Sequence, residues 1–178
     1  LHDIAFEILA DPATHEDPFA RLELITELAV QSGPAGMAGG QMMDLVAGDV
    51  TYDIAGITRL QQLKTGALIQ WCLEAGAIMG RASEAQRKSL RAYARDLGLA
   101  FQIADDLLDV EGESAKTGKA VQKDAAAGKA TFVSLLGVER ARTQAHALID
   151  QAIGHLSAYG PEADLLRAIA RFAVERDR

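Results

Sequence analysis

The sequence has little cysteine and few aromatic residues. Cys72 is the single cysteine among 178 residues, so no disulfide can form within the chain, and a reducing, cytoplasmic setting is the expectation. Phe, Trp and Tyr together make up 5% of the residues. Because strands favour aromatic and β-branched side chains, this composition disfavours a β-sandwich or β-barrel.

Two further absences narrow the possible functions. The four histidines lack the spacing of a zinc site, and no apolar run is long enough to span a membrane. The formal net charge is −7, so the overall field does not favour nucleic acid or an anionic membrane surface. We therefore expect no nucleic-acid partner and no membrane span, and any anionic ligand must be held by local positive charge.

Helix-forming residues are abundant instead. The chain contains 33 alanines and 21 leucines, and apolar residues recur at spacings of three and four, as in Ile4 and Ile8. This pattern predicts an all-α fold, an antiparallel helical bundle that forms a single domain over residues 1–178. The helices are predicted over 1–10, 18–31, 35–48, 57–80, 84–110, 129–157 and 161–176, which leaves 111–128 as the long irregular segment.

The helix predicted over 84–110 is apolar almost all round in its second half. On a helical wheel, Leu97, Phe101 and Leu108 form one stripe, while Ile103 and Leu107 cover the opposite side. A helix of this kind is buried. Its remaining polar sector is narrow and holds Gln102, Asp105, Asp106 and Asp109.

Three carboxylates on one strip of a buried helix require positive charge. Like charges at i and i+4 repel, and removal from water increases the cost. Carboxylate oxygens without histidine or cysteine suit a hard cation, and Mg²⁺ takes one or two carboxylates together with phosphate oxygens. The strip therefore predicts a diphosphate carried on magnesium. The alternative is a solvent-exposed acidic face, which the surrounding apolar sector disfavours.

A basic segment follows the acidic strip directly. Residues 116–129 contain four lysines against one aspartate, and Gly112, Gly118 and Gly128 allow the segment to fold closely over a ligand. Lysine ammonium groups are suitable point charges for phosphate oxygens. Lysines that simply face water are the alternative interpretation.

A polar tripeptide interrupts an apolar helical stretch earlier in the chain. Lys64, Thr65 and Gly66 predict a helix bend whose polar groups point inward, although Lys64 could also extend to the surface. Upstream, the glycine-rich segment 33–40 is expected to permit close helix approach, and Gln41 and Asp44 form a polar pair one turn later.

These residues resemble a known family. The segment 98–109 resembles the second aspartate-rich motif of the trans-isoprenyl diphosphate synthases. Matching segments occur in the family's order at 39–44, 64–68, 118–119 and 128–131. The resemblance covers nearly the whole chain and implies the helical bundle of the isoprenoid synthase type.

The resemblance also implies roles for individual residues. Asp105 and Asp106 are expected to bind the Mg²⁺ that serves the diphosphates, with Asp109 completing the motif. Lys64, Thr65 and Gln102 are expected to be catalytic, Thr65 and Gln102 by lining the reacting allyl group. The expected substrate-binding residues are Gln41, Asp44, Lys64, Thr65, Gln102, Lys119 and Lys129.

The implied activity is that of a short-chain synthase. Such an enzyme condenses isopentenyl diphosphate with an allylic diphosphate through a Mg²⁺-assisted allylic cation, and farnesyl diphosphate is the expected product. A homodimer is expected as well. The family's first aspartate-rich motif is absent from this sequence, so we expect the chain to be the C-terminal portion of a longer enzyme. A terpene cyclase of the same fold and a noncatalytic regulatory subunit of a synthase are the alternatives.

Overall fold

A computed structural model describes residues 1–117 and 130–176, and every regular element in these ranges is helical. The α-helices are α1 His2–Ala10, α2 Pro18–Ser32, α3 Met37–Leu45, α4 Ile54–Gln61, α5 Ala67–Met79, α6 Glu84–Thr117, α7 Phe132–Leu136, α8 Val138–His155 and α9 Asp164–Glu175. A π-helical turn, η1 (Gln62–Gly66), joins α4 to α5, and a 3₁₀ turn, η3 (Pro161–Ala163), precedes α9. The predicted all-α fold is confirmed.

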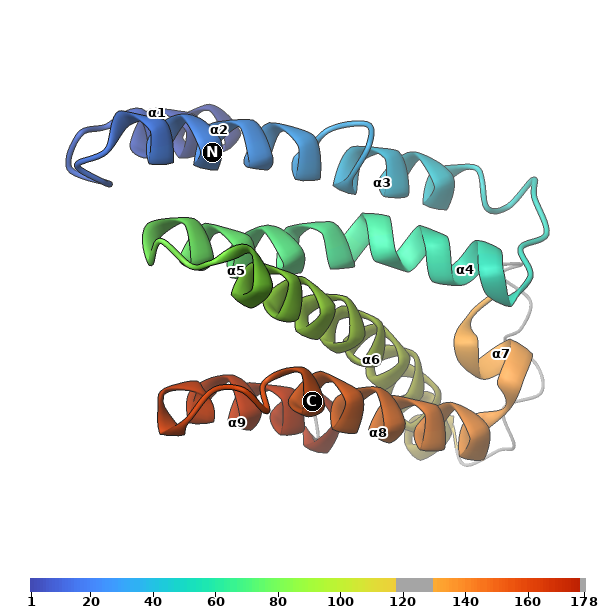
Figure 1. Ribbon diagram of the computed structural model, residues 1–178. Coiled ribbons are helices and arrows are strands. Elements are labelled where there is room, and N and C mark those ends of the chain that lie inside the picture. The colour runs from blue at the N-terminus through green and yellow to red at the C-terminus, as the bar shows by residue number, and fades with distance from the viewer. Residues whose placement is uncertain (118–129, 177–178) are drawn as a thin grey trace.

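The helices lie in layers around α6. The first three helices, α1 to α3, form an outer layer, and α4, η1 and α5 run beneath it as one continuous rod, as Figure 1 shows. Helix α6 packs against this rod on one side and against α8 on the other, and α9 contacts both α6 and α8. The helix that carries the acidic strip is therefore surrounded by other helices.

The main hydrophobic core follows α6. Tyr93 and Ile103 are fully buried, Leu107 is buried, and they pack in one cluster with Ile149 of α8 and with Leu156, which directly follows α8. Burial of both apolar sides of α6 confirms the arrangement predicted from its sequence. A smaller cluster of Ala20, Leu24 and Ile78 joins α2 to α5. The assignment of residues 1–178 to one domain stays a prediction.

Local sequence explains where several helices begin. Asp17 precedes α2 and accepts a hydrogen bond from the backbone N–H of Phe19, with Pro18 at the first helical position. Asp53 caps α4 in the same way through Gly56 N–H. Thr131 and Ser134 form a reciprocal capping box at the start of α7.

Two predicted boundaries are wrong. Helix α6 continues to Thr117 rather than ending at 110, because residues 111–117 are mostly good helix formers and include no proline. The single helix predicted over 129–157 is broken at Gly137, which has φ +81°, a conformation that glycine adopts readily. This break gives α7 its own short axis beside the acidic strip.

A buried ion-pair network fixes α6 to α5 and α2. The carboxylate of Glu74 on α5 has a side chain only 5% exposed and pairs with Arg87 at 2.5 Å and with Arg91 at 3.2 Å. Arg87 also pairs with Glu23 of α2 at 2.5 Å. A second pair, from Asp96 to His155 at 3.0 Å, links α6 to α8.

In the ranges 1–117 and 130–176, no helix combines the length and the apolar character that crossing a membrane requires.

Candidate active site

The acidic strip lies in the second half of α6. Gln102, Asp105 and Asp106 are half-buried, and Asp109, one turn further on, is exposed. Since the other faces of this part of α6 carry the core, the strip is the polar sector through which the helix reaches solvent. The structure thus places the four predicted residues on neighbouring turns of one helix.

Both carboxylate oxygens of Asp105 are engaged. Oδ2 accepts a hydrogen bond from Nε2 of Gln102 at 3.1 Å, and Oδ1 forms an ion pair with the guanidinium group of Arg176. Burial raises the pKa of the Asp105 carboxyl, Arg176 opposes that rise, and the negative charge of Asp109 adds to it. Asp105 therefore sits where negative charge is costly and positive charge is needed.

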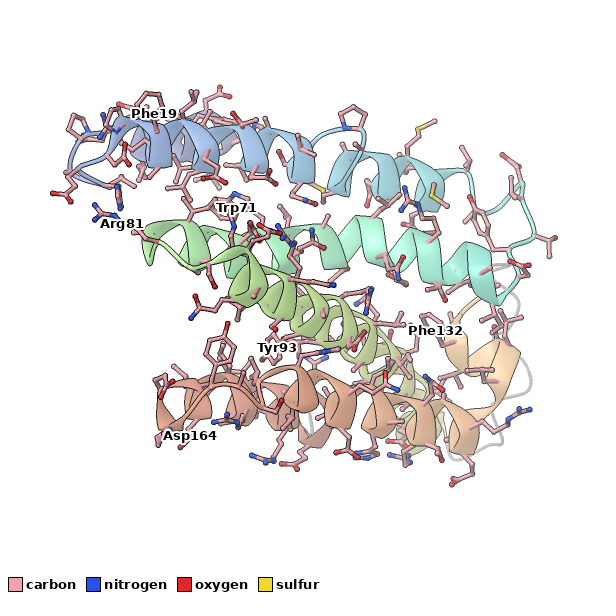
Figure 2. All side chains as sticks on the ribbon, in the orientation of Figure 1. Phe19, Trp71, Arg81, Tyr93, Phe132 and Asp164 are labelled. Carbon is pink, nitrogen blue, oxygen red and sulfur yellow. The ribbon has the colours of Figure 1, made fainter. Side chains whose placement is uncertain are left out.

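Asp106 points toward a different element. Its Oδ2 accepts a hydrogen bond from the backbone N–H of Phe132 at 2.9 Å, so this carboxylate caps the start of α7. Figure 2 shows the Phe132 side chain between α7 and α6. Burial, together with the negative charges of Asp109 and Asp105, raises the pKa of Asp106 to about 6, although that hydrogen bond opposes the rise.

A cleft of about 620 Å³ opens beside the strip, between α6, α8 and α9. Asp105 and Asp109, at positions i and i+4 of α6, line it together with Arg176 and His146. These two aspartates of the strip thus face one cleft. Asp106 and Gln102 are not among the residues that line this cleft.

The donor set of the cleft fits a magnesium ion that is only partly held by protein. Among the residues described, no group of three or more His, Cys, Asp or Glu side chains is arranged to hold a metal ion. Mg²⁺ does not need such a cage, because it takes one or two carboxylates and fills its other positions with water and phosphate oxygens. Asp105 and Asp109 supply two carboxylates whose mutual repulsion a cation would relieve.

A second polar group is centred on η1. Nζ of Lys64 pairs with Oδ2 of Asp44 at 2.9 Å, and both side chains are partly exposed, at 35% and 20%. The α3 backbone approaches η1 closely at Gly40, where an added Cβ would overlap the backbone of Lys64. The predicted bend is thus a π-helical turn, and the predicted close approach of the glycine-rich segment is confirmed at Gly40.

Close packing also brings η1 against α6. A Cβ on Gly98 would lie 3.2 Å from the Cα of Gly66, so the two backbones touch at this point. Gly98 is one turn before Gln102, and Thr65, which is half-buried, directly precedes Gly66. Of the ion pairs in the described part of the chain, the one that Lys64 makes is with Asp44, and none joins it to the aspartates of α6.

Of the remaining predicted residues, the structure describes Gln41 but not Lys119 or Lys129. Gln41 is half-buried on α3, one turn before Asp44. Lys119 and Lys129 lie outside the described residues, so their predicted contacts with a diphosphate stay predictions.

Comparison with known proteins decides the family. A family model described as polyprenyl synthetase matches residues 2–169. The chain belongs to the polyprenyl synthetase family. Among its curated relatives, farnesyl diphosphate synthase of Escherichia coli (strain K12) is 38% identical over all of the chain and 61% of the relative. A chloroplastic geranylfarnesyl diphosphate synthase of Leucosceptrum canum is 39% identical over 98% of the chain and 49% of the relative.

Solved structures agree with the family and the fold. An FPP/GFPP synthase from Zymomonas mobilis has a TM-score of 0.86 and 58% identity; the match covers 97% of the present chain and 57% of the synthase. A geranyltransferase from Helicobacter pylori, complexed with magnesium and isoprenyl diphosphate, has a TM-score of 0.77 and 31% identity. The match covers 97% of the present chain and 56% of the geranyltransferase. The chain therefore spans between about half and three fifths of the length of these relatives.

Sequence reasoning missed two partners of the aspartates. Arg176 reaches Asp105 from a position 71 residues away, and the Phe132 backbone reaches Asp106 across 26 residues. For Arg176 a weak signal was present, because it follows the amphipathic C-terminal helix and lies three residues after the apolar Ala173, which is buried.

Proposed function

We propose that this protein acts as a short-chain prenyl diphosphate synthase, or as part of one. In this proposal it condenses isopentenyl diphosphate with an allylic diphosphate, and farnesyl diphosphate is the product. The observation that carries the proposal is the pair Asp105 and Asp109, which line one cleft on a helix whose other faces are buried. The names of the relatives from Escherichia coli and Zymomonas mobilis support the reaction class.

The aspartates hold the cation that the leaving group needs. Asp105 and Asp109 are the residues that would bind Mg²⁺ in the cleft, with Asp106 beside them as the third acid of the strip. Bound magnesium supplies positive charge that stabilises the diphosphate as the allylic carbon–oxygen bond ionises. The chain's contribution is to fix these carboxylates on a rigid helix, so that little reorganisation is needed when charge develops.

Lysines hold the rest of the diphosphate charge. The side chain of Lys64 is 35% exposed while its ammonium group pairs with Asp44. Because an ammonium group has three donor hydrogens, it can also donate to a phosphate oxygen without leaving that partner. The Asp44 carboxylate fixes the direction of the Lys64 side chain. We place Lys119 and Lys129 in the same role, as the family resemblance implies.

Gln102 and Thr65 suit the organic end of the substrate. Nε2 of Gln102 donates a hydrogen bond to Asp105, and this bond orients the Gln102 amide. The carbonyl oxygen Oε1 is then left to interact with a positive charge. Thr65 is half-buried and directly precedes Gly66, which packs against Gly98, one turn before Gln102. It offers a hydroxyl oxygen on this side of α6. Partial negative charges of this kind stabilise an allylic cation, and the apolar faces of the surrounding helices limit the access of water.

A product assay tests the proposal. The purified protein is incubated with Mg²⁺, geranyl diphosphate and radiolabelled isopentenyl diphosphate, and the products are separated by chain length. Labelled farnesyl diphosphate supports the proposal. A cyclic hydrocarbon would assign the protein to the cyclases, and activity that requires an added partner subunit would make it a regulatory or partial chain.

Matched variants make the assay specific to the strip. Asp105→Asn removes one carboxylate of the cleft and is expected to lower turnover by at least about a hundredfold, the scale of an electrostatic group in a preorganised site. Asp150→Asn removes an exposed carboxylate from α8 and is the control. Equal turnover of the two variants would contradict the role given to Asp105.

We also propose that the protein is a homodimer. Several large apolar side chains of the outer layer are exposed, including Ile8 at 58%, Phe19 at 77% and Leu22 at 59%. Figure 2 shows Phe19 on the outer side of α2. Exposed apolar side chains gathered on one layer are typical of an interface. Phe19→Asp is expected to convert a dimer to a monomer in sedimentation experiments.

The cytoplasmic setting stays a prediction.

A further inference from the structure

The C-terminal end of α9 reaches into the candidate metal site. Arg176 follows Glu175, the last residue of α9, and its side chain is only 14% exposed. The guanidinium group pairs with Oδ1 of Asp105, and its central carbon lies 4.0 Å from the centroid of the Phe101 ring. Arg176 therefore binds α6 at two neighbouring points of the strip, by charge and by a cation–π contact.

This contact and the Gln102 amide together engage both carboxylate oxygens of Asp105. Oδ1 is taken by Arg176 and Oδ2 by the Gln102 amide. A divalent cation that approaches Oδ1 meets a guanidinium group that also lines the cleft. Two positive groups a few ångströms apart in a partly buried site repel strongly, so the cation and Arg176 compete for the same oxygen.

Arg176 is also held in a way that permits release. Its Nε is buried and makes no hydrogen bond to any residue that the structure describes. Moving the side chain into solvent would give that nitrogen a partner in water. Because Arg176 follows the helix end, its own backbone contributes one hydrogen bond, from its N–H to Phe172 O at 3.2 Å. Its departure therefore leaves the body of α9 intact.

We propose that Arg176 is a displaceable counter-ion, which occupies Asp105 while no metal is bound and leaves when a divalent cation binds there. Metal binding is thereby coupled to release of the C-terminal end of α9 from α6. This inference rests on the proposed role of Asp105 as a magnesium ligand. By thermodynamic linkage the coupling acts both ways, so weakening the Arg176–Asp105 contact must tighten metal binding by the same factor.

Titration with Mn²⁺ as a spectroscopic substitute for Mg²⁺ tests the competition directly. Free Mn²⁺ is measured by electron paramagnetic resonance for the wild type and for Arg176→Gln. The variant is expected to bind Mn²⁺ about tenfold more tightly, the scale of one charge-assisted contact that no longer has to be displaced. Arg176→Lys keeps a positive charge and is expected to stay near the wild-type affinity.

The matched control is Arg171→Gln. Arg171 is exposed on the same helix, so its replacement removes the same charge from α9 without touching the strip. It is expected to change the Mn²⁺ affinity less than about twofold, because exposed charges are screened by salt. Circular dichroism of each variant checks that the helices are retained.

Hydrogen exchange provides a second readout that does not depend on a variant. Adding Mg²⁺ to the wild type is expected to speed amide exchange in the last turn of α9, near Phe172, while the interior of α8 is unchanged. Slower exchange there on adding Mg²⁺ would overturn the proposal, since it would show that the cation and the α9 end bind together.

The outcomes separate this inference from the proposed function. If Asp105→Asn abolishes Mn²⁺ binding and Arg176→Gln leaves it unchanged or weaker, Asp105 is a metal ligand and the displacement proposal is wrong. If Mn²⁺ binding does not depend on Asp105 in any variant, both the metal site and the displacement are wrong. Tighter binding by Arg176→Gln, with Arg171→Gln at the wild-type value, supports both.

Discussion

Gly98 of α6 lies against Gly66 of η1, so close that a Cβ on Gly98 would be 3.2 Å from the Gly66 Cα. This contact sets the distance between two groups of polar residues. On one side stand Lys64 and Thr65, and on the other stands Gln102, one turn after Gly98. Direct packing of the two backbones thus determines where the polar side chains of the candidate site lie.

Gly40→Ala tests this packing from the other side of η1. A methyl group at Gly40 would overlap the backbone of Lys64, so α3 must move away from the π-helical turn. The expected cost is about 2 kcal/mol of unfolding free energy, typical of overpacking in a close contact. Urea unfolding measures it. Because Asp44 moves with α3, turnover is expected to fall as well.

Gly76→Ala is the matched control for that variant. Gly76 is an exposed position inside α5, and an added Cβ there meets nothing within 4 Å. Alanine is expected to stabilise the protein by about 0.5–1 kcal/mol, since glycine loses more backbone entropy in a helix. If Gly40→Ala were equally stabilising, the close approach of α3 and η1 would be contradicted.

Glu74→Gln tests the network that fixes α6. The Glu74 side chain is 5% exposed and pairs with both Arg87 and Arg91. Neutralising it therefore removes one negative partner from each of these two guanidinium groups. The expected loss is about 2 kcal/mol, below the usual range for a broken buried pair because Arg87 keeps Glu23. Denaturant unfolding at neutral pH is the measurement.

The control for Glu74 is Glu84, which pairs with the same Arg91 from the surface. Its side chain is 77% exposed. Glu84→Gln is expected to cost less than about 0.5 kcal/mol, as exposed ion pairs contribute little. Similar losses in the two variants would mean that burial of Glu74 has no energetic consequence.

Asp106→Asn tests whether burial of the Asp106 carboxylate charge destabilises the folded protein. Burial disfavours the ionised form of Asp106 and raises its pKa to about 6 in the folded protein, above the ordinary aspartate value of 3.8. The folded state therefore binds a proton more tightly than the unfolded state does, and stability falls as pH rises between these two values. Asparagine carries no charge, and its side-chain oxygen can still accept from Phe132 N–H.

The difference in stability between Asp106→Asn and the wild type is expected to grow as the pH rises. Without divalent cations, Asp106→Asn is expected to be about 1 kcal/mol more stable than the wild type above about pH 6, after allowing for partial exposure, and equal to it near about pH 4. Unfolding curves in EDTA at several pH values measure this. A constant difference at every pH would contradict the cause given for the shift.

The strongest features of the fold could be predicted because they depend on local pattern. Ile103 and Leu107 lie opposite Leu97, so the sequence alone indicates that this helix is covered on both sides. Lys64 and Gly66 within an apolar helix likewise indicate an irregular turn. The π-helical geometry itself needed the contact with α3, which local sequence does not describe.

Other features depend on contacts between distant segments. Gly137 ends a helix while Gly154 lies inside one, and nothing in their immediate neighbours distinguishes them. Arg176 and Asp105 are far apart in sequence, and their pairing requires the packing of α9 on α6. The predicted convergence of three carboxylates failed to anticipate that Asp106 would serve as a helix cap.

In the proposed function, Asp105 and Asp109 hold a divalent cation together with a diphosphate. Isothermal titration calorimetry of inorganic diphosphate into the protein, with and without Mg²⁺, tests it most directly. We expect Mg²⁺-dependent binding in the wild type and in Asp150→Asn, and a loss of at least about a hundredfold in Asp105→Asn/Asp109→Asn. Binding that is equally tight in the double variant, or independent of Mg²⁺, would contradict the claim.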